Sequence, residues 1–552
     1  MFLKSFWHLA GFFMLGDVAD WLSTALTSLS THSNQWALVA RRTRLAGTIV
    51  RMTESLPVFI EALRDPKAYR HPVQTVDVLQ THISWILLAG DFAYKIKKPV
   101  RLVFLDFSTL SLRHQYCMKE LALNKRFAPD LYLDVVGIGQ GEAGLCMETT
   151  GKPVEYAVRM RRFDEANRLD HVCERGGLSA EHLSGLADSM IRFYAQAPIA
   201  AGHSSYGELA DIERQALDNF VDPLKSLTQA ESQARLLRLR EWTMEQTEAL
   251  APQFVKRKKN GLVRECHGDL HLANMVLLNG QVTVFDCIEF ADDLRWIDVA
   301  SDVAFVFVDL LSRSHTGLAN GFLNEFLSKS GDVDALPVLR FYAVYRVMVR
   351  LKVACIRSEQ TQSPDPAVET YLALAEALMR AKPEQLLITH GLSGCGKSSA
   401  ARAWLQQNQP GLRLCFRADV ERKRLFGLDE LAQTHFGPGQ GIYAEHASAQ
   451  TYARLRELAD SALRAGWSVV LDASFLKHSD RHQVGALARA AGVSFQILAP
   501  HAKPEELRRR IAARQAAAQD ASEANAEVLE RQMRVMEPLT AQERLAVLDI
   551  GN

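Results

Sequence analysis

Polar side chains suited to catalysis gather in the segment HGDLHLANMVLLNGQVTVFDCIEF, residues 267–290. An Asn-Gly pair at 279–280, between two apolar runs, predicts a β-hairpin with a two-residue type I′ turn. Counting outward from that turn places Asp286 beside Asn274 at the open end of the hairpin. An amide oxygen and a carboxylate suit Mg²⁺, which takes one or two protein oxygens together with substrate phosphates. Asp269, in the preceding loop, is a candidate general base for an attacking hydroxyl.

The second constellation is the phosphate-binding motif GLSGCGKS at residues 391–398. It lies between the apolar strand LLITH and the helix SSAARAWLQQ. In this arrangement backbone N–H groups and the helix N-terminus bind phosphates, Lys397 reaches the β- and γ-phosphates, and Ser398 contacts Mg²⁺. The residues expected to bind the nucleotide are Gly391, Leu392, Ser393, Gly394, Cys395, Gly396, Lys397, Ser398 and Ser399.

A further Mg²⁺ contact is expected at Asp472, where the apolar strand SVVLDAS ends. A carboxylate at the carboxyl end of a parallel strand lies at the edge where ligands bind in open α/β sheets. The alternative is an aspartate that only caps a helix or closes a strand.

The polar residues of segment 267–290 form the first constellation. This constellation resembles the catalytic loop of the aminoglycoside phosphotransferase and protein-kinase-like superfamily. In that pattern His267-x-Asp269 with Asn274 supplies the base and one Mg²⁺ ligand, and Asp286 supplies the other. The form His-Gly-Asp is that of small-molecule kinases. The resemblance implies an ATP site in which His267 belongs to the nucleotide-binding machinery.

The same resemblance requires a strand lysine held by a helix glutamate. Lys95 in GDFAYKIKKPV and Glu120 on the next expected helix fit these positions and would hold the α- and β-phosphates. Lys97 shares a strand face with Lys95, so it stays an alternative. No G-x-G-x-x-G loop precedes them, and the strand YAVRMRRF (156–163) is expected to join the lobes and meet adenine through its backbone.

Two features beyond the P-loop resemble P-loop small-molecule kinases and polynucleotide 5′-hydroxyl kinases. The segment RADVERKRLFG suggests that Asp419 activates the acceptor hydroxyl and Arg422 orients it, although it also reads as a capped helix start. Arg510 and Arg514 lie one helical turn apart, like lid arginines that cover the transferred phosphate. A solvated helix face is the alternative for this arginine pair.

The elements that must position these residues fall into two groups. From about residue 73, strands and one helix predict an α+β lobe with an antiparallel sheet, followed by a mostly helical region up to about 356. From 386 onward strand and helix alternate, which predicts an α/β domain with a parallel sheet. The expected fold is a two-lobe, protein-kinase-like α+β domain followed by a P-loop α/β domain.

Domain boundaries follow from composition. We expect an N-terminal extension outside any core at 1–51, a kinase-like domain at 52–360, a linker and helix at 361–383, and a P-loop domain at 384–552. A basic run before Met52 and a capped helix after it suggest that Met52 is the true start. The polar segment around Pro364 and Pro366 predicts two separate cores, each able to fold alone.

Composition excludes several classes of protein. The chain has 552 residues, 48% hydrophobic and 23% charged, with equal numbers of acidic and basic side chains. This composition argues against a disordered chain and against a bundle of membrane helices. Because the net charge is zero, no overall electrostatic field attracts nucleic acid or an anionic membrane. Residues 6–15 are apolar but too short to span a bilayer. Eight scattered cysteines without a C-x-x-C pair suggest a reducing, cytoplasmic location.

Together these features predict a kinase with two sites for ATP and Mg²⁺ that acts on hydroxyls of small molecules. The chain resembles bacterial proteins that fuse an aminoglycoside phosphotransferase-like domain to a P-loop domain. A polynucleotide or nucleotide acceptor is an alternative for the P-loop domain. The other alternative is a regulatory or scaffold protein in which one or both domains bind nucleotide without turnover.

Overall fold

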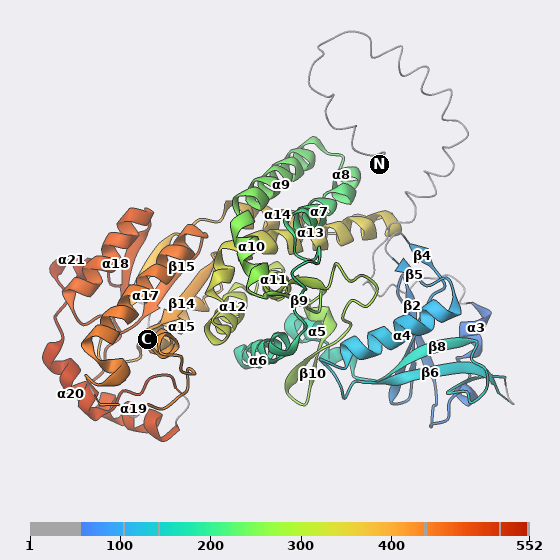
Figure 1. Cartoon of the computed structure of the whole chain (residues 1–552), viewed down its shortest axis with the longest axis horizontal. Coiled ribbons are helices and arrows are strands. Elements are labelled where there is room, and N and C mark those ends of the chain that lie inside the picture. Colours follow the sequence, from blue (N-terminus) through green and yellow to red (C-terminus); the bar gives the residue numbers. More distant parts are fainter. Residues whose placement is uncertain are drawn as a thin grey trace, which may run out of the picture.

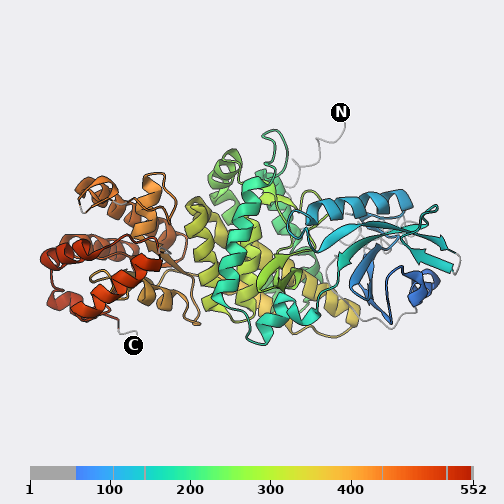
Figure 2. The same cartoon turned by 90° about the horizontal axis from the view of Figure 1, so that it is seen from below.

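The computed structural model describes residues 57–102, 105–141, 144–434, 436–437, 439–517 and 520–548. The expected extension at 1–51 and the proposed start at Met52 lie outside these residues. Figures 1 and 2 show the described chain as three parts in a row. A sheet lobe lies at one end, a helical lobe in the middle and an α/β domain at the other end.

The first lobe is an antiparallel six-stranded sheet covered by one long helix. Its strand order is β1 (Val76–Gln80), β2 (Ser84–Ala89), β3 (Phe92–Lys97), β8 (Glu155–Arg161), β6 (Tyr132–Gly141) and β7 (Gly144–Met147). The helix is α4 (Leu110–Asn124), and α3 (Val58–Ala62) and the short pair β4 (Arg101–Leu102) and β5 (Leu105–Asp106) complete the lobe. Thr109 caps α4 by accepting a hydrogen bond from Leu112 N at 3.2 Å. The expected α+β lobe is confirmed.

The strand expected to meet adenine has a different environment. β8 pairs with β3 along one edge and with β6 along the other. Both edges of the backbone of 156–161 are therefore used inside the sheet, which leaves only Arg162 and Phe163 of the predicted adenine-binding segment 156–163 beyond the strand. The chain leaves the sheet only after Arg162, whose N–H donates to Asp91 O at 2.8 Å.

The second lobe is helical and carries two short antiparallel strand pairs. Its helices are α5 (Leu169–Glu174), α6 (Ala180–Gln196), α7 (Leu209–Asp218), α8 (Val221–Ser226), α9 (Ala230–Ala249), α10 (Ala251–Lys259), α11 (Val299–Ser312), α12 (Thr316–Ser330), α13 (Leu336–Thr361) and α14 (Ala367–Arg380). The strand pairs are β9 (Val263–Glu265) with β12 (Trp296–Asp298), and β10 (Met275–Leu278) with β11 (Gln281–Val284). α11 is buried along almost its whole length, which suits a central helix.

The third part is a parallel four-stranded sheet between helices. The strand order is β14 (Arg413–Arg417), β15 (Ser468–Asp472), β13 (Gln385–Thr389) and β16 (Ser494–Leu498). Its helices are α15 (Lys397–Leu405), α16 (Ala418–Leu425), α17 (Glu445–Arg464), α18 (His478–Ala491), α19 (Pro504–Ala517), α20 (Ala526–Val535) and α21 (Ala541–Leu545). The expected parallel sheet is confirmed.

The expectation of two separate cores is wrong. One cluster of buried apolar side chains runs from α5 through the helical lobe into β13, β14, β15 and α17. Phe307 of α11 and Trp467, which precedes β15, meet across this boundary with ring centroids 5.7 Å apart. The segment expected as a linker contributes α14, whose Leu372 and Ala375 are buried in the same cluster. The two prolines correctly predict a turn between α13 and α14, but they do not predict how the helices on either side of it pack.

Candidate active sites

The hairpin that carries the first constellation has the expected register. Met275 pairs with Val284 and Leu278 with Gln281, and Phe285 N donates to Asn274 O at 3.0 Å. The two turn residues have φ values of 50° and 77°, the left-handed values that a type I′ turn requires. Asp286 therefore follows directly on the residue opposite Asn274, as the sequence predicts.

The candidate base, Asp269, contacts the hairpin and a neighbouring histidine. Its Oδ2 lies 3.4 Å from His271 Nε2 and accepts a hydrogen bond from Asn274 Nδ2 at 3.2 Å. Burial alone would raise the pKa of this carboxyl, but His271, followed by Arg350, holds the pKa well below its usual range. Asp269 is therefore held in its ionised form, and 28% of its side chain stays exposed.

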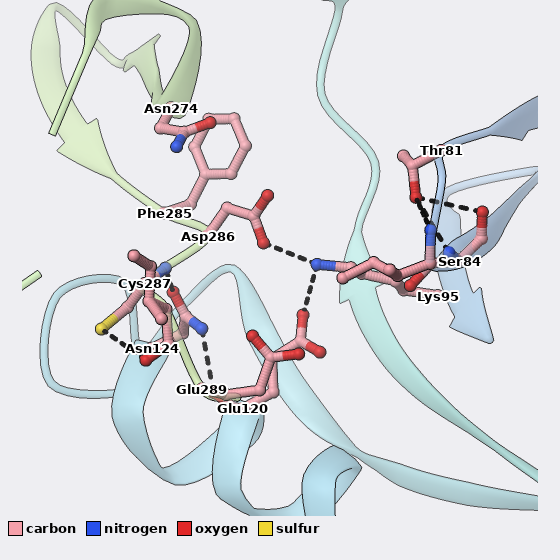
Figure 3. A network of polar contacts seen from close by, with 12 residues as sticks. Thr81, Ser84, Lys95, Glu120, Asn124, Asn274, Phe285, Asp286, Cys287 and Glu289 are labelled. Carbon is pink, nitrogen blue, oxygen red and sulfur yellow. Dashed lines mark hydrogen bonds and ion pairs between the residues drawn. The ribbon is translucent and has the colours of Figure 1, made fainter. Parts of the chain in front are cut away.

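Lys95 joins the two lobes at the same place. Its Nζ lies 2.5 Å from Asp286 Oδ1 and 2.8 Å from Glu120 Oε1 (Figure 3). Burial of the ammonium disfavours its charged form, but Asp286 and Glu120 outweigh this and raise the pKa of Lys95. The lysine therefore keeps its charge between a strand, a helix and the end of the hairpin.

The alternative lysine, Lys97, lies deeper in the lobe. Its side chain has no exposed surface and contacts Glu120 Oε2 at 2.6 Å and also the carboxylate of Glu289. A group enclosed in this way cannot meet a phosphate without unfolding its surroundings. Of the two candidates, Lys95 is the one that lies beside the candidate metal ligands. Glu289 was part of the segment that the sequence singled out, but its pairing with Lys97 is evident only in three dimensions.

The prediction that His267 is a nucleotide-binding residue is wrong, because its side chain is enclosed by protein. The ring is fully buried, its Nε2 lies 2.9 Å from Phe285 O, and its Nδ1 lies 3.3 Å from Asp269 N. It therefore connects the catalytic loop to the strand before Asp286. Glu120 is likewise fully buried, and its Oε1 contacts Lys95 Nζ.

Three buried polar residues that the sequence did not assign to the site hold the catalytic loop in place. Asp302 of α11 accepts hydrogen bonds from the N–H groups of residues 267 and 268 at 2.9 and 3.0 Å, and Asp309 accepts one from Leu272 N at 2.9 Å. Arg346 of α13 donates to Gly268 O at 2.9 Å. The available signal was charge within the apolar stretches of α11 and α13, since buried charges are almost always paired.

The oxygens at the end of the hairpin fit Mg²⁺. Lys95 bonds only one carboxylate oxygen of Asp286, and none of the described residues donates a hydrogen bond to the amide oxygen of Asn274. Asp286 is 39% exposed and has φ 64°, a left-handed value that an aspartate tolerates. One amide and one carboxylate oxygen match the small protein contribution typical of Mg²⁺ bound to phosphates. The described residues contain no cluster of three His, Cys, Asp or Glu side chains that could hold a metal alone.

The second constellation forms the turn between β13 and α15. Gly391, Gly394 and Gly396 all have positive φ, at 135°, 85° and 102°. A side chain at Gly394 would bring a Cβ within 2.9 Å of Leu507 O, so this loop needs glycine for conformation and for space. Lys397 is the first residue of α15, and its Nζ donates to Leu392 O at 2.7 Å.

A cleft of about 1580 Å³ opens in front of this turn and collects most of the residues predicted for the second site. Predicted residues that line it are Ser393, Gly394, Cys395, Gly396, Lys397, Ser398, Ser399, Asp419, Arg422, Asp472, Arg510 and Arg514. The predicted residues Gly391 and Leu392 do not line the cleft; Gly391 is buried and Leu392 is half-buried.

The predicted polar residues of this cleft have distinct partners. Asp472 accepts a hydrogen bond from Thr389 Oγ1 at 3.2 Å and lies 3.5 Å from Arg417 Nε. Arg422 donates to Ile442 O at 3.1 Å, whereas the carboxylate of Asp419 makes no hydrogen bond or ion pair with any described residue. This carboxylate lines the cleft.

Helices α19 and α20 contact the turn between β13 and α15. Arg510 lies 3.4 Å from Gly394 O, and Arg514 donates to Ala524 O at 3.0 Å. Gln532 of α20 accepts a hydrogen bond from Ser393 N at 2.7 Å. Sequence reasoning missed Gln532, because a single glutamine on an amphipathic helix carries no signal.

Comparisons with known proteins divide the chain at the same place as the two sites. Residues 111–342 match the phosphotransferase enzyme family, and residues 386–539 match a family of AAA domains. Uncharacterized proteins of Mycobacterium bovis and Mycobacterium tuberculosis are 29% identical over 413 residues, which is 73% of this chain and 80% of theirs.

Several solved structures are similar to a portion of this chain. A choline/ethanolamine kinase family protein from Mesorhizobium loti is 11% identical and covers 56% of this chain and 89% of its own, with a TM-score of 0.35. An aminoglycoside phosphotransferase from Alicyclobacillus acidocaldarius is 13% identical, with coverages of 60% and 94% and a TM-score of 0.35. Kti12 from Chaetomium thermophilum, in complex with ADP-AlF3, is 17% identical, with coverages of 30% and 89% and a TM-score of 0.23.

Proposed function

We propose that this chain, which joins a phosphotransferase-family domain to a AAA-type P-loop domain, is a kinase with two sites for ATP and Mg²⁺. Each site would transfer the γ-phosphate to a hydroxyl of a small molecule. The observation that carries the proposal is the meeting of Asp269, Asn274, Asp286 and Lys95 at the junction of two lobes. Binding alone would need no carboxylate base in that position.

In the first site each of these residues has a defined part. Asp269 accepts the proton of the acceptor hydroxyl as it attacks the γ-phosphorus. Asn274 and Asp286 would hold Mg²⁺, which neutralises charge on the phosphates when bound. Lys95, kept in place by Glu120, would contact the α- and β-phosphates and would exchange its contact with Asp286 for them.

In the second site the turn at 391–398 would bind the phosphates through its N–H groups, with Lys397 on the β- and γ-phosphates. Ser398 and Asp472 would hold Mg²⁺. Asp419 would act as base and Arg422 would orient the acceptor, since both line the same cleft as the turn. Arg510 and Arg514 would cover the transferred phosphate.

A cytoplasmic location belongs to the same proposal. All eight cysteines are free thiols in the structure, as expected in a reducing compartment. Among the described residues, no helix combines the length and the apolar character that crossing a bilayer requires.

A larger acceptor is a second candidate for the P-loop domain. The cleft of about 1580 Å³ exceeds the roughly 300–1,000 Å³ of ordinary small-molecule pockets. Tyr443 and Tyr452 line it together with arginines, and aromatic and cationic groups suit bases and phosphates. Phosphorylation of a 5′-hydroxyl oligonucleotide by the full chain would favour this candidate over a small acceptor.

The first site is tested by Asp269→Asn in the full chain. We expect transfer by this site to fall by at least ~100-fold while ATP affinity stays within a factor of two or so, because the base acts on the acceptor and not on the nucleotide. Steady-state kinetics with a panel of alcohols and calorimetric ATP binding measure the two effects. Unchanged turnover would remove Asp269 from the mechanism, and turnover by neither protein would favour a regulatory role.

The second site is tested by Lys397→Ala. We expect its turnover to fall by roughly 100-fold or more, because a charge that stabilises the transferred phosphate is lost. Calorimetry should then count one remaining ATP site, and the Asp269-dependent activity should persist. Loss of both activities would show a composite site and contradict two independent kinases.

A further inference from the structure

We propose that the acceptor of the first site carries an anionic group, a carboxylate or a phosphate, which Arg350 binds beside Asp269. This inference rests on the proposed function of that site and adds the chemical class of its substrate.

Arg350 lies on the side of α13 that faces the catalytic loop. Arg346, one helical turn earlier, donates to Gly268 O at 2.9 Å and to Ser301 O at 3.1 Å. Residues four apart share one face of a helix, so Arg350 continues this face past the residue that precedes Asp269. The influence of Arg350 on the pKa of Asp269 agrees with this placement.

The guanidinium of Arg350 is held at one end and open at the other. Its Nε donates to Tyr371 Oη at 3.3 Å, and its Cζ lies 5.7 Å from the centroid of the same ring. None of the described residues accepts a hydrogen bond from its two terminal nitrogens, and neither nitrogen is among the buried polar atoms that lack a partner. Two accessible, parallel N–H donors match the oxygens of a carboxylate or phosphate.

The other charged groups around Arg350 leave it without a direct partner. Asp309 and Asp269 are the carboxylates that face it, but neither forms an ion pair with it among the described residues. Asp309 is engaged instead by Leu272 N, with Arg313 at 3.7 Å. Arg350 therefore has charge available for a ligand.

Two polar side-chain atoms at the same loop have no hydrogen-bond partner within the part of the chain that the structure describes. Asp309 Oδ1 and His271 Nδ1 are buried and have no hydrogen-bond partner among the described residues. Buried polar atoms are nearly always paired in folded proteins, by protein, water or ligand. These two atoms are enclosed by protein, so they mark a polar interior behind the loop, and an ammonium group beside Arg350 would be repelled by the guanidinium.

The experiment compares matched acceptors in the full chain carrying Lys397→Ala, so that transfer reports the first site. Pairs that differ by one carboxylate are glycerol and D-glycerate, ethanolamine and L-serine, and 1-amino-2-propanol and L-threonine. Glycerol 3-phosphate distinguishes a phosphate from a carboxylate. We expect an anionic member to have the higher kcat/KM in its pair.

Variants of Arg350 separate binding from folding. Arg350→Ala should raise KM for the preferred anionic acceptor by roughly 10- to 150-fold, the range for loss of a charged hydrogen bond, with KM for ATP unchanged. Arg350→Lys should recover part of the loss, and Tyr371→Phe should show a smaller effect. Arg357→Ala is the matched control, because Arg357 lies on the same helix and has its own partner in Asp365.

Several results would overturn the inference. These are equal or better use of the member without the carboxylate in each pair, an unchanged acceptor KM in Arg350→Ala and Arg350→Lys, and neither binding nor turnover of any member that carries the carboxylate or phosphate. If ATP turnover still depends on Asp269 in those cases, the inference alone fails. If Asp269→Asn leaves ATP turnover unchanged, the proposed function fails with it.

Discussion

Two lysines of β3 lie on one face of the strand and contact different carboxylates. Lys95 bridges Glu120 and Asp286, while Lys97 bridges Glu120 and Glu289 in the interior. Glu120 therefore has a cation at each oxygen, and both hold its pKa below its usual range although burial alone would raise it. The outer lysine is the one that our proposal places on the phosphates, and the inner lysine holds the glutamate that contacts it.

This difference predicts opposite phenotypes for the two lysines. Lys97→Met should lower the free energy of unfolding by about 3–5 kcal/mol, because Glu289 would be left buried without its cation. Lys95→Met should mainly reduce ATP affinity and turnover of the first site, since Asp286 can still reach solvent. Urea denaturation and ATP titration of both variants measure this. A loss of ATP binding confined to Lys97→Met would reverse the assignment.

At the scale of elements, the β10–β11 hairpin carries the metal-ligand candidates on its open end. Its turn fixes the register, and a one-residue slip would move Asp286 to the opposite face of the strand. A side chain added at Gly280 would meet no atom within 4 Å, so the residue is required for its φ of 77° and not for space.

Gly280→Ala should therefore destabilise the protein by roughly 1–2 kcal/mol through backbone strain alone. A weaker Mg²⁺-dependent affinity for ATP in the first site is expected with it, because Asn274 and Asp286 are placed by this turn. Gly185→Ala, in the exposed part of α6 and also free of contacts, is the control and should stabilise by up to ~1 kcal/mol. Equal stability of the two variants would contradict the type I′ requirement.

At the scale of the whole molecule, α12 of the helical lobe covers the open edge of the P-loop sheet. β14 is one of the two edge strands, and two asparagines one helical turn apart on α12 bond its backbone. Asn320 accepts from Arg413 N at 3.4 Å, and Asn324 accepts from Cys415 N at 2.7 Å. These contacts occupy an edge that would otherwise be open to pairing with another chain.

Helix α12 packs so closely on the α/β domain that two of its glycines, Gly317 and Gly321, provide a matched pair of substitutions. A Cβ at Gly317 would lie 2.0 Å from Gln406 O, whereas at Gly321 its nearest neighbour would be a side-chain nitrogen at 3.5 Å. Gly317→Ala should cost roughly 1–3 kcal/mol by overpacking, and Gly321→Ala should be tolerated. Calorimetry should show a single unfolding transition for the native chain and a lower Tm for Gly317→Ala. Native-like melting of Gly317→Ala would show that the two domains do not pack as described.

The sequence alone determined the local features of this protein. The Asn-Gly turn, the alternation of the strands and the glycines before Lys397 are set by backbone conformation within a few residues, so both motifs and both sheets could be predicted. The side chains that pair over a long distance in the chain could not be predicted. The pairing of Lys95 with Asp286 and of Arg346 with the catalytic loop joins residues far apart in the chain, and many partners would satisfy the same charges.

Only the tertiary structure decided three questions. It distinguished Lys95 from Lys97, because their shared strand face gives equal periodicity and burial depends on what packs above them. It removed His267 from the cofactor position, since a ring beside a motif can face inward or outward. It showed that the helical lobe and the α/β domain share one apolar cluster, because apolar residues on α11, α12 and α13 do not reveal in sequence whether they pack on their own lobe or on the next domain.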